Sequence, residues 1–590
     1  MLPSRVVSEL RDAYVFLRNL EHALQGMEDK QTQILPEDAL SCARVARIMG
    51  FDSWEDCLSA LDEHRSRVAR HFADIIATED QDEADESSVD DGCYELWLSE
   101  MDEAAAVGWL EQSGFEDPEG SYKRLASLRD SRTVQTLQTQ GRKRLNQFVP
   151  LLINALMDVE NPSETLDRVL QLVEAILRRT AYMVLLMENP GAMTQLVRLC
   201  SESPWIARLL ADTPLLLDEL LNAESLYSPP AKEELQDDLR QQMLRIPYED
   251  LEEQMEALRY FKKAHVLRVA ASELKGTLPL MKVSDYLTWI AEVVLDHVVD
   301  VAFSNLVSRH GYPRRADGSA CDTDFAIIGY GKLGGIELGY TSDLDLVFVH
   351  QADPQLATDG DKPIDNAVFY TRLGQRIVHI LSTQTPSGQL YEVDMRLRPS
   401  GNSGLLVSTL QAFEKYQQED AWTWEHQALA RARGVAGCDD TLKAFEDIRH
   451  QILCRQRDKA SLRQEVVDMR EKMRSNLGTP AARQNDVFHI KHDNGGIVDV
   501  EFMVQYLMLA WCPEHPELTQ WSDNIRQLEE LGRAGVLPVD DTERLREVFI
   551  TLRSTIHRRA LQNLNSQVEG GAFTEERDYI QSMWKKVMVE

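Results

Sequence analysis

Apolar residues recur at intervals of three and four along most of the chain, a spacing typical of amphipathic helices. Asn161-Pro162-Ser163 precedes one such run, which comprises Leu166, Val169, Leu170, Val173 and Leu177. Because proline is tolerated in the first helical turn, this tripeptide predicts a helix start. Thr213 followed by Pro214 predicts a second start in the same way. Residues 105–310 are therefore expected to form a series of helices joined by short polar turns.

Strand-like patterns are confined to about residues 324–400. The segments 325–328 and 342–349 are rich in β-prone apolar residues, and residues 389–398 alternate strictly between polar and apolar side chains. Such alternation predicts a strand with two distinct faces. The side chains expected on its polar face are Glu392, Asp394, Arg396 and Arg398. The whole pattern predicts a predominantly helical α+β fold, in which helical domains flank a small mixed β-sheet.

The stretch from Glu79 to Asp91 interrupts the helical pattern. Eight of its thirteen residues are acidic and almost none is apolar. Such a segment cannot bury enough apolar surface to fold by itself, so it predicts a solvated linker. The predicted organisation is a helical piece at 1–78, an acidic linker at 79–104, a helical domain at 105–310, a sheet-bearing domain at 311–435 and a C-terminal helical bundle at 436–590.

The N-terminal piece repeats a pattern found near the other end of the chain. Residues 10–22 align with residues 545–557, with leucine, arginine, acid, aromatic and histidine positions at the same offsets. Two amphipathic helices can share such a pattern by chance. Alternatively, the protein is internally duplicated, and the chain is a fragment whose first residues close an upstream unit. A piece this small has a marginal core. We therefore expect it to dock on the neighbouring helical domain through apolar residues such as Leu10, Tyr14, Leu17 and Leu24.

Composition and charge narrow the possible ligands. The formal net charge of −34 repels nucleic acid and anionic membranes, so neither is expected as a partner. A phosphate-bearing ligand then requires a local basic pocket. The eight cysteines are scattered without any C-x-x-C pair, which argues against a zinc site or disulfide framework and favours a reducing cytosol. No apolar run approaches about 18 residues and no signal peptide is recognisable, so a cytoplasmic location is predicted.

A glycine-rich segment, Gly329–Gly335, follows the first predicted strand and contains the pattern G-x-G-x-x-G. A dinucleotide-binding crossover is excluded, because the next strand begins at Ser342 and a parallel crossover needs a dozen or more residues. A Walker loop is excluded as well, since no serine or threonine follows Lys332. Two interpretations remain open: an ordinary tight turn, and a turn whose backbone N–H groups approach a phosphate.

The acidic residues of the predicted strands carry the most specific chemistry. Asp343 and Asp345 are two positions apart, so both carboxylates are expected to project from one face of a strand. Their mutual repulsion is costly unless a cation compensates it, although an exposed acidic edge explains an isolated pair as well. Asp394 adds a third carboxylate, and three can hold two metal ions ~4 Å apart for phosphoryl or nucleotidyl transfer. Oxygen ligands favour Mg²⁺ or Mn²⁺. Arg396 and Arg398 are predicted to contact phosphate oxygens.

Three long segments resemble one family. Residues 329–348, 391–401 and 421–429 are similar to the characteristic segments of the glutamine synthetase adenylyltransferases, in the polymerase-β-like nucleotidyltransferase superfamily. The resemblance continues through residues 495–502 and the C-terminal helices. It implies a bifunctional enzyme in which one half removes AMP from glutamine synthetase by phosphorolysis and the other adds AMP from ATP. PII signal proteins and glutamine regulate the balance. With one motif set in its C-terminal part, the chain is expected to be the transferase half and to lack the removing activity.

The resemblance also implies the roles of individual residues. Asp343, Asp345 and Asp394 take the metal-ligand positions for two Mg²⁺ or Mn²⁺ ions bound with ATP. Asp394 is the group expected to orient the tyrosine hydroxyl of glutamine synthetase or to accept its proton. The residues expected to contact the nucleotide are Gly334, Gly335, Ser342, Lys332, Arg396 and Arg398.

Two further groups and one alternative function remain. Asp499 and Glu501 suggest a second metal site, but their place at a predicted helix start favours capping and pairing between helices. Trp422, Trp424 and His426 have helical spacing and are expected to pack in the core. The alternative to catalysis is a sensor that binds nucleotide only to change its contacts with partners. The presence of all three aspartates disfavours that alternative.

Overall fold

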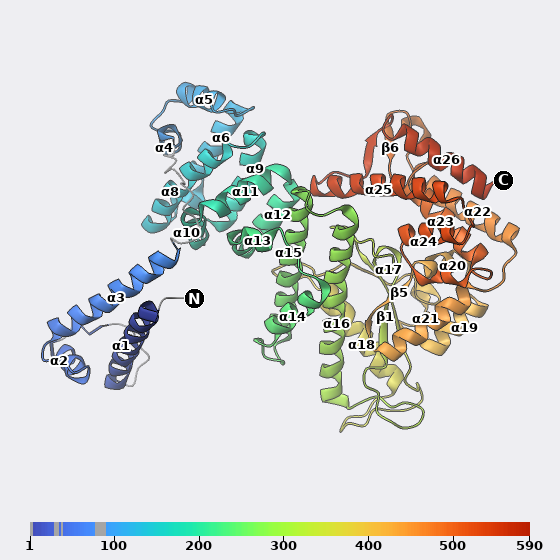
Figure 1. Ribbon diagram of the computed structural model, residues 1–590, viewed down its shortest axis with the longest axis horizontal. Coiled ribbons are helices and arrows are strands. Elements are labelled where there is room, and N and C mark those ends of the chain that lie inside the picture. Colours follow the sequence, from blue (N-terminus) through green and yellow to red (C-terminus); the bar gives the residue numbers. More distant parts are fainter. Residues whose placement is uncertain (1–3, 29–34, 37–38, 77–89) are drawn as a thin grey trace. The chain divides into compact units, whose positions relative to one another are not determined.

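The computed structural model describes residues 4–28, 35–36, 39–76 and 90–590 (Figure 1). The chain forms two compact units, residues 1–89 and residues 90–590. Most of the first half of the predicted acidic linker lies outside the described residues. Each unit is described below by itself.

The first unit consists of α1 (Ser4–Glu28), α2 (Ala39–Ile48) and α3 (Trp54–Ile76). Leu20 and Leu24 of α1 lie one turn apart and bury against Val45 of α2 and Leu61 of α3. Tyr14, by contrast, is 67% exposed. The three helices therefore enclose a small apolar cluster of their own, so residues such as Leu24 do not need another domain to be buried. Docking of this unit on residues 105–310 stays a prediction.

The second unit begins earlier than expected. Within the predicted linker 79–104, residues 91–98 form helix α4, whose Cys93, Leu96 and Trp97 are buried. Asp90 caps this helix by accepting the N–H of Gly92. The linker prediction was wrong here because the acidic residues cap and flank an apolar stripe rather than replace it.

A long array of helices follows, as predicted for residues 105–310. One α-helix begins at Pro162 and a 3-10 helix begins at Pro214, both at predicted helix starts. The elements are α4 (Asp91–Leu98), α5 (Glu103–Gln112), α6 (Pro118–Asp130), α7 (Arg132–Gln135), α8 (Thr139–Leu156), α9 (Pro162–Ile176), α10 (Ala181–Glu188), α11 (Pro190–Glu202), α12 (Pro204–Asp212), η1 (Pro214–Leu221), α13 (Ala223–Leu226), α14 (Lys232–Met243), α15 (Leu251–Leu274) and α16 (Leu280–His310).

A five-stranded mixed sheet follows α16, in agreement with the predicted fold class. Its central strand β1 pairs antiparallel with β2 and β5, while β3 and β4 pair parallel with β2. The predicted boundary at residue 435 falls inside β5, so the sheet extends two residues beyond it. The elements are β1 (Phe325–Gly329), α17 (Gly331–Gly334), β2 (Leu344–His350), α18 (Asn366–Ser382), β3 (Val393–Asp394), η2 (Gly401–Ser403), β4 (Val407–Thr409), α19 (Leu410–Glu419), α20 (Thr423–Ala430) and β5 (Arg433–Gly437).

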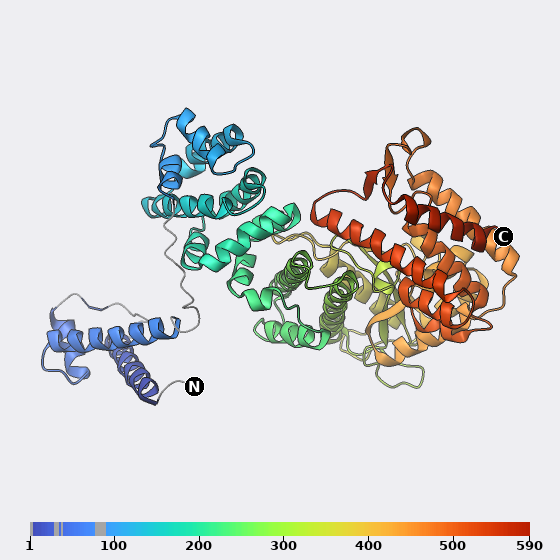
Figure 2. The same ribbon diagram turned by 45° about the horizontal axis from the view of Figure 1, so that its top comes forward.

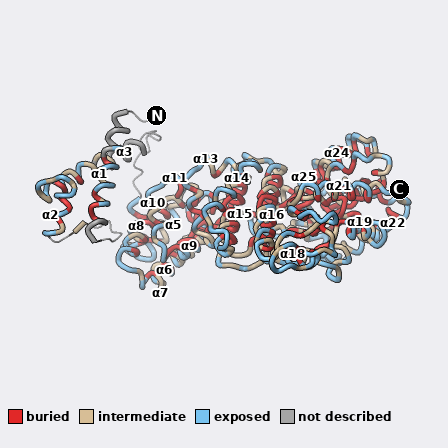
Figure 3. The backbone as a smooth tube through the Cα atoms, turned by 90° about the horizontal axis from the view of Figure 1, so that it is seen from below, coloured by how far each residue is buried: buried red, intermediate tan, exposed pale blue. Residues whose placement is uncertain are grey.

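Helices cover both faces of the sheet, which explains why β1 is apolar at every position. Phe325 and Ile327 of β1 pack in the cluster that includes α16 and α18. Ala326 and Ile328 point the other way, into a cluster shared with the C-terminal helices. Figure 2 shows the strands between these two sets of helices, and Figure 3 shows buried positions concentrated along α16.

The remaining residues form the predicted C-terminal helical bundle together with a small antiparallel pair, β6 and β7, that was not predicted. Each of these strands has three residues, too few to establish a periodicity. Among the described helices, none combines the length and apolarity needed to cross a membrane. The elements are α21 (Asp439–Leu453), α22 (Lys459–Leu477), η3 (Ala481–Arg483), β6 (Val487–His489), α23 (Ile497–Trp511), η4 (Pro516–Gln520), α24 (Asn524–Arg533), α25 (Val539–Leu561), β7 (Gln567–Glu569) and α26 (Thr574–Met588).

Candidate active site

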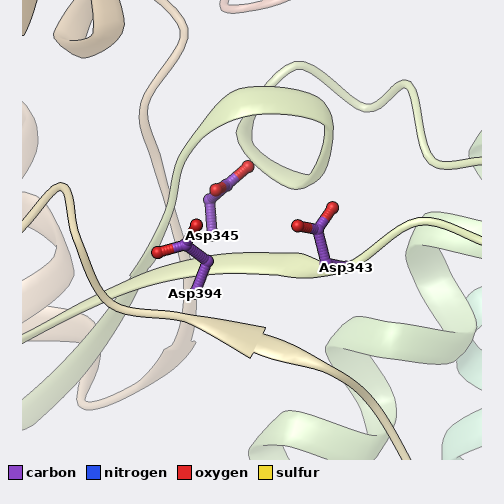
Figure 4. A group of neighbouring side chains, drawn as sticks. All are labelled: Asp343, Asp345 and Asp394. Atoms are coloured by element: carbon purple, nitrogen blue, oxygen red, sulfur yellow. The ribbon is translucent and has the colours of Figure 1, made fainter.

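Three aspartates meet at the beginning of β2 (Figure 4). Asp343 immediately precedes the strand, Asp345 is its second residue, and Asp394 lies opposite Asp345 in the parallel pair with β3. One carboxylate oxygen of each lies within 4.8 Å of the others. Leu344 and Leu346 are fully buried, so the strand's alternation holds the acids at the edge of the core, as predicted.

The cluster carries unbalanced negative charge. Burial, together with the charges of Asp343 and Asp394, raises the pKa of Asp345 to about 6. Hydrogen bonds from Arg396 instead lower the pKa of Asp394. A divalent cation would remove the repulsion at Asp345, and three converging carboxylates provide the oxygen ligands that Mg²⁺ and Mn²⁺ prefer. The residues present therefore fit a hard metal ion.

The glycine that touches the cluster is Gly331. Its φ is +55°, and a Cβ atom at this position would lie 2.3 Å from Oδ2 of Asp345. The neighbouring N–H of Tyr330 donates to the carbonyl of Asp345 at 2.9 Å. A side chain at residue 331 would therefore displace the carboxylate. Gly334 and Gly335 instead lie against Arg431, whose carbonyl and Nη2 would be 2.1 and 2.6 Å from the added Cβ atoms, so their predicted phosphate contact stays a prediction.

Lys332 and Ser342 lie together beside the aspartates. The Lys332 ammonium donates to Oγ of Ser342 at 3.3 Å, and the same Oγ accepts the N–H of Gly339 at 3.0 Å. Loss of solvent around the ammonium and the nearby charge of Lys491 lower the pKa of Lys332, while Asp343 opposes the shift. The two predicted phosphate contacts are therefore adjacent and next to the carboxylates.

The predicted ten-residue strand 389–398 is wrong. Strand β3 contains two residues, and the chain turns immediately afterwards. The turn forms because the N–H of Arg396 donates to Oδ1 of Asp394 at 2.8 Å and its Nε donates to Oδ2 at 2.7 Å. Arg398 closes the turn by donating to the carbonyl of Met395 at 2.8 Å. Arg396 thus reaches the site by folding back, whereas Arg398 does not share a strand face with Asp394.

A cavity of about 500 Å³ opens beside Asp345, Gly331 and Arg396. Its other wall comes from the C-terminal bundle, which pattern analysis of the strand window could not link to the site. The family resemblance extended through residues 495–502, but it did not place these residues at the site. The bundle residues and α20 residues that line the cavity include Trp424, Gln427, Met469, Met473, Lys491, His492, Glu501, Phe502 and Gln505.

The aromatic residues before this wall only partly follow the prediction. His426 is buried and its Nε2 lies 2.9 Å from the carbonyl of Gln417, as expected for a core residue. Trp422 is 70% exposed, so its predicted core packing is wrong. It is the residue that caps α20, a position that projects its side chain away from the helical stripe. Trp424 is 37% exposed and faces the cavity.

Asp499 and Glu501 are paired with arginines, which confirms the pairing interpretation. Asp499 is fully buried and accepts Nε of Arg470 at 2.7 Å and the N–H of Gly495 at 2.7 Å. Glu501 accepts Nη1 of Arg431 at 2.8 Å. The pair of Glu501 and Arg431 links α23 of the bundle to the turn that contains Gly334 and Gly335. Neither acid joins the aspartate cluster.

Comparisons with known proteins show what this chain is similar to. A family model described as glutamate-ammonia ligase adenylyltransferase matches residues 193–448. The chain is 54% identical, over 593 aligned residues each, to bifunctional glutamine synthetase adenylyltransferase/adenylyl-removing enzymes of Hahella chejuensis and Pseudomonas putida. A protein of the same name from Pseudomonas aeruginosa is 52% identical over 598 residues. Over 99–100% of its length, the chain is therefore similar to part of these glutamine synthetase adenylyltransferases.

The alignments to these adenylyltransferases cover 99–100% of the chain but only 61% of each of these relatives. A second family model, described as GlnD PII-uridylyltransferase, matches residues 1–76 and also residues 467–570. Because one model matches both segments, it supports the internal duplication over chance similarity between helices. The aligned residues 10–22 and 545–557 lie in α1 and α25.

Proposed function

We propose that this chain transfers AMP from ATP to a tyrosine of glutamine synthetase, with release of pyrophosphate. The observation that carries the proposal is the cluster of Asp343, Asp345 and Asp394 beside a cavity of about 500 Å³. It occurs in a chain 54% identical to proteins named as adenylyltransferases. Glutamine synthetase as substrate, and glutamine and a PII-type signal protein as regulators, are part of the same proposal. So is a cytoplasmic location, which eight free cysteines support.

The three aspartates are proposed to hold two Mg²⁺ or Mn²⁺ ions together with ATP. When bound, the ions would polarise the attacking hydroxyl and neutralise charge on the triphosphate. Asp345 is proposed as a ligand, and because its pKa is raised only to about 6, protons compete with the metal at this carboxylate mainly below neutral pH. Asp394 remains ionised, since Arg396 lowers its pKa, and it is therefore available to accept a hydrogen bond from the tyrosine hydroxyl.

The residues next to the cluster are proposed to hold the triphosphate. Lys332 supplies an ammonium within reach of Ser342, and Arg396 supplies a guanidinium with an exposed side chain. The turn at Gly331 lets backbone approach the same point. The apolar side of the cavity, which includes Trp424 and Phe502, is left for the adenine ring. Binding ATP between the sheet and the bundle excludes water from the reacting phosphorus.

The test is a transfer assay with ATP labelled on either the α- or the γ-phosphorus. The chain is incubated with unmodified glutamine synthetase and Mg²⁺ or Mn²⁺. Incorporation of the α-label but not of the γ-label, with stoichiometric pyrophosphate, is expected. The matched control is Asp345→Asn, which should incorporate neither label. Nucleotide binding without incorporation by the wild-type chain would instead support the sensor alternative and overturn the proposal.

A further inference from the structure

The C-terminal bundle contains a second cavity, of about 580 Å³, that shares no lining residue with the catalytic cavity. We call it the bundle cavity. Its walls are the end of α22, the loop 478–484, the turn at 493–495 and the start of α26. Figure 1 shows α22, β6 and α26 in this part of the fold.

Hydrogen bonds tie the walls of the bundle cavity together. The N–H of Thr479 donates to Oδ1 of Asp493 at 2.6 Å, and Nε2 of Gln484 donates to the carbonyl of Thr479 at 3.0 Å. Gly495 has a φ of +80°, and a Cβ atom there would lie 2.8 Å from the carbonyl oxygen of Arg577. The turn and α26 are therefore in close contact. The cavity is a built feature of the bundle rather than a gap between independent segments.

Three lining residues carry polar atoms that lack a partner. Thr479 is only 8% exposed, and its Oγ1 makes no hydrogen bond within the described part of the chain. The Nε atoms of Arg474 and Arg577 are likewise buried without a partner there. Buried polar groups in folded proteins are nearly always hydrogen-bonded. Because a guanidinium only donates and a hydroxyl can donate, an acceptor is the group that would satisfy all three.

The charges around these donors also favour an anion. Asp499 accepts hydrogen bonds from both Arg470 and Arg474, so one carboxylate serves two guanidinium groups. Arg577 contacts the carbonyl of Gly570 and the ring of Phe488. The nearby carboxylate of Asp493 is occupied by the backbone N–H groups of Thr479 and His489. Two carboxylates of the lining oppose an anion: that of Asp493, whose charge these backbone N–H groups solvate, and that of Glu471, which is exposed on α22.

We propose that the bundle cavity binds a small oxyanion, a carboxylate or a phosphate, through Thr479, Arg474 and Arg577. A planar guanidinium matches the oxygen pair of either group, and the threonine hydroxyl supplies a further donor. The volume admits an organic carboxylate or phosphate ester as well as the bare ion.

The cavity's position gives the bound oxyanion a route to the catalytic cavity. Helix α22 presents Arg474 to the bundle cavity, and Met469 and Met473 of the same helix line the catalytic cavity. An oxyanion that competes with Asp499 for Arg474 would loosen the first turn of α23, which contains Asp499. Glu501, two residues after Asp499, lines the catalytic cavity. The bundle cavity is thus an effector site. This regulatory role rests on the proposed AMP transfer, whereas the binding itself does not.

Binding is tested by isothermal titration of the whole chain with sodium phosphate and with sodium acetate, each against chloride at equal ionic strength. The wild-type chain is expected to bind at least one of them. Thr479→Val removes the hydroxyl while keeping the shape, and Arg577→Lys removes the guanidinium while keeping the charge. Each variant should weaken binding about tenfold, as for one hydrogen bond to a charged group. Two controls should bind as the wild type does: Arg483→Gln, an exposed arginine of η3, and Arg396→Gln in the catalytic cavity.

The outcomes separate the site from its role. The proposed site would be overturned if neither anion gave binding heat, or if Thr479→Val bound with the wild-type affinity. It would also be overturned if only Arg396→Gln lost anion binding, because that result would assign the anion to the catalytic cavity. Circular dichroism identifies any variant that fails to fold. If Arg577→Lys does not fold, the affinity of Thr479→Val alone tests the site. A change of AMP transfer by the anion in the wild type but not in Thr479→Val supports the effector role. Binding without such a change overturns that role and leaves the site standing.

Discussion

Two acidic pairs with the same two-residue spacing, Asp343/Asp345 and Asp499/Glu501, have opposite electrostatic environments. Asp499 and Glu501 are each met by a guanidinium, from Arg470 and Arg431, at 2.7 and 2.8 Å. At the β2 cluster, no arginine of the described residues hydrogen-bonds Asp345, and burial together with the neighbouring aspartates raises its pKa to about 6 despite the charge of Arg396. A pair neutralised by the protein serves packing, whereas a pair left charged is available to a cation. Spacing alone does not distinguish these two uses, and the neighbouring cations do.

The largest expected effect is on catalysis. Asp345→Asn should reduce AMP transfer by on the order of 100-fold or more, since it removes a ligand from the proposed two-metal site. Its thermal stability without metal should equal or exceed that of the wild type, because the substitution relieves repulsion. Transfer to glutamine synthetase and thermal unfolding are measured side by side, with Asp343→Asn as the matched variant. If both variants kept more than about a tenth of the activity, the metal assignment would be wrong.

The opposite effect on stability, a loss, is expected for a substitution in the neutralised pair of Asp499 and Arg470. Asp499→Asn leaves Arg470 buried without its counter-charge, and removing one partner of such a pair costs about 3–5 kcal/mol. Chemical denaturation should therefore show a large loss of stability. This variant leaves the ion pair between Arg431 and Glu501 unchanged, so the loss of stability is assigned to the pair of Asp499 and Arg470. A loss below about 1 kcal/mol would show that the pair is screened by water and does not hold the helices together.

Only part of the candidate active site could be predicted from the sequence. The order of Asp343, Asp345 and Asp394 along β-prone segments placed all three correctly, because strand pairing brings such residues together. The strand through Arg398 was wrong because Asp394 captures the N–H of Arg396 and turns the chain, an interaction that alternation cannot reveal. The wall formed by Lys491 depends on packing between segments more than 100 residues from β2, to which periodicity is blind. The family resemblance extended through residues 495–502 but did not assign the bundle to the site either.

A smaller effect is expected in the pH dependence of stability. Because the folded-state pKa of Asp345 is raised to about 6 from its ordinary value of 3.8, its contribution is fully present below about pH 4 and is lost as pH rises through 6. Wild type should therefore be less stable than Asp345→Asn at pH 7, by about 1–2 kcal/mol after allowance for solvent screening, and equally stable at pH 4. Thermal unfolding in chelator measures the difference. Adding Mg²⁺ should stabilise only the wild type, and a pH-independent difference would contradict the assignment.

The smallest effect is expected for Arg396, at the β2 cluster. Arg396 hydrogen-bonds Asp394 but its side chain is 75% exposed, so Arg396→Gln should change stability by less than about 1 kcal/mol. The same substitution at Arg470, which is fully buried against Asp499, should cost several times more. In catalysis the order reverses. Without Arg396 the pKa of Asp394 is no longer held down, so the acidic limb of the pH profile of kcat/KM should move to higher pH in Arg396→Gln. An unshifted limb, with activity lowered equally at every pH, would instead assign Arg396 to nucleotide binding alone.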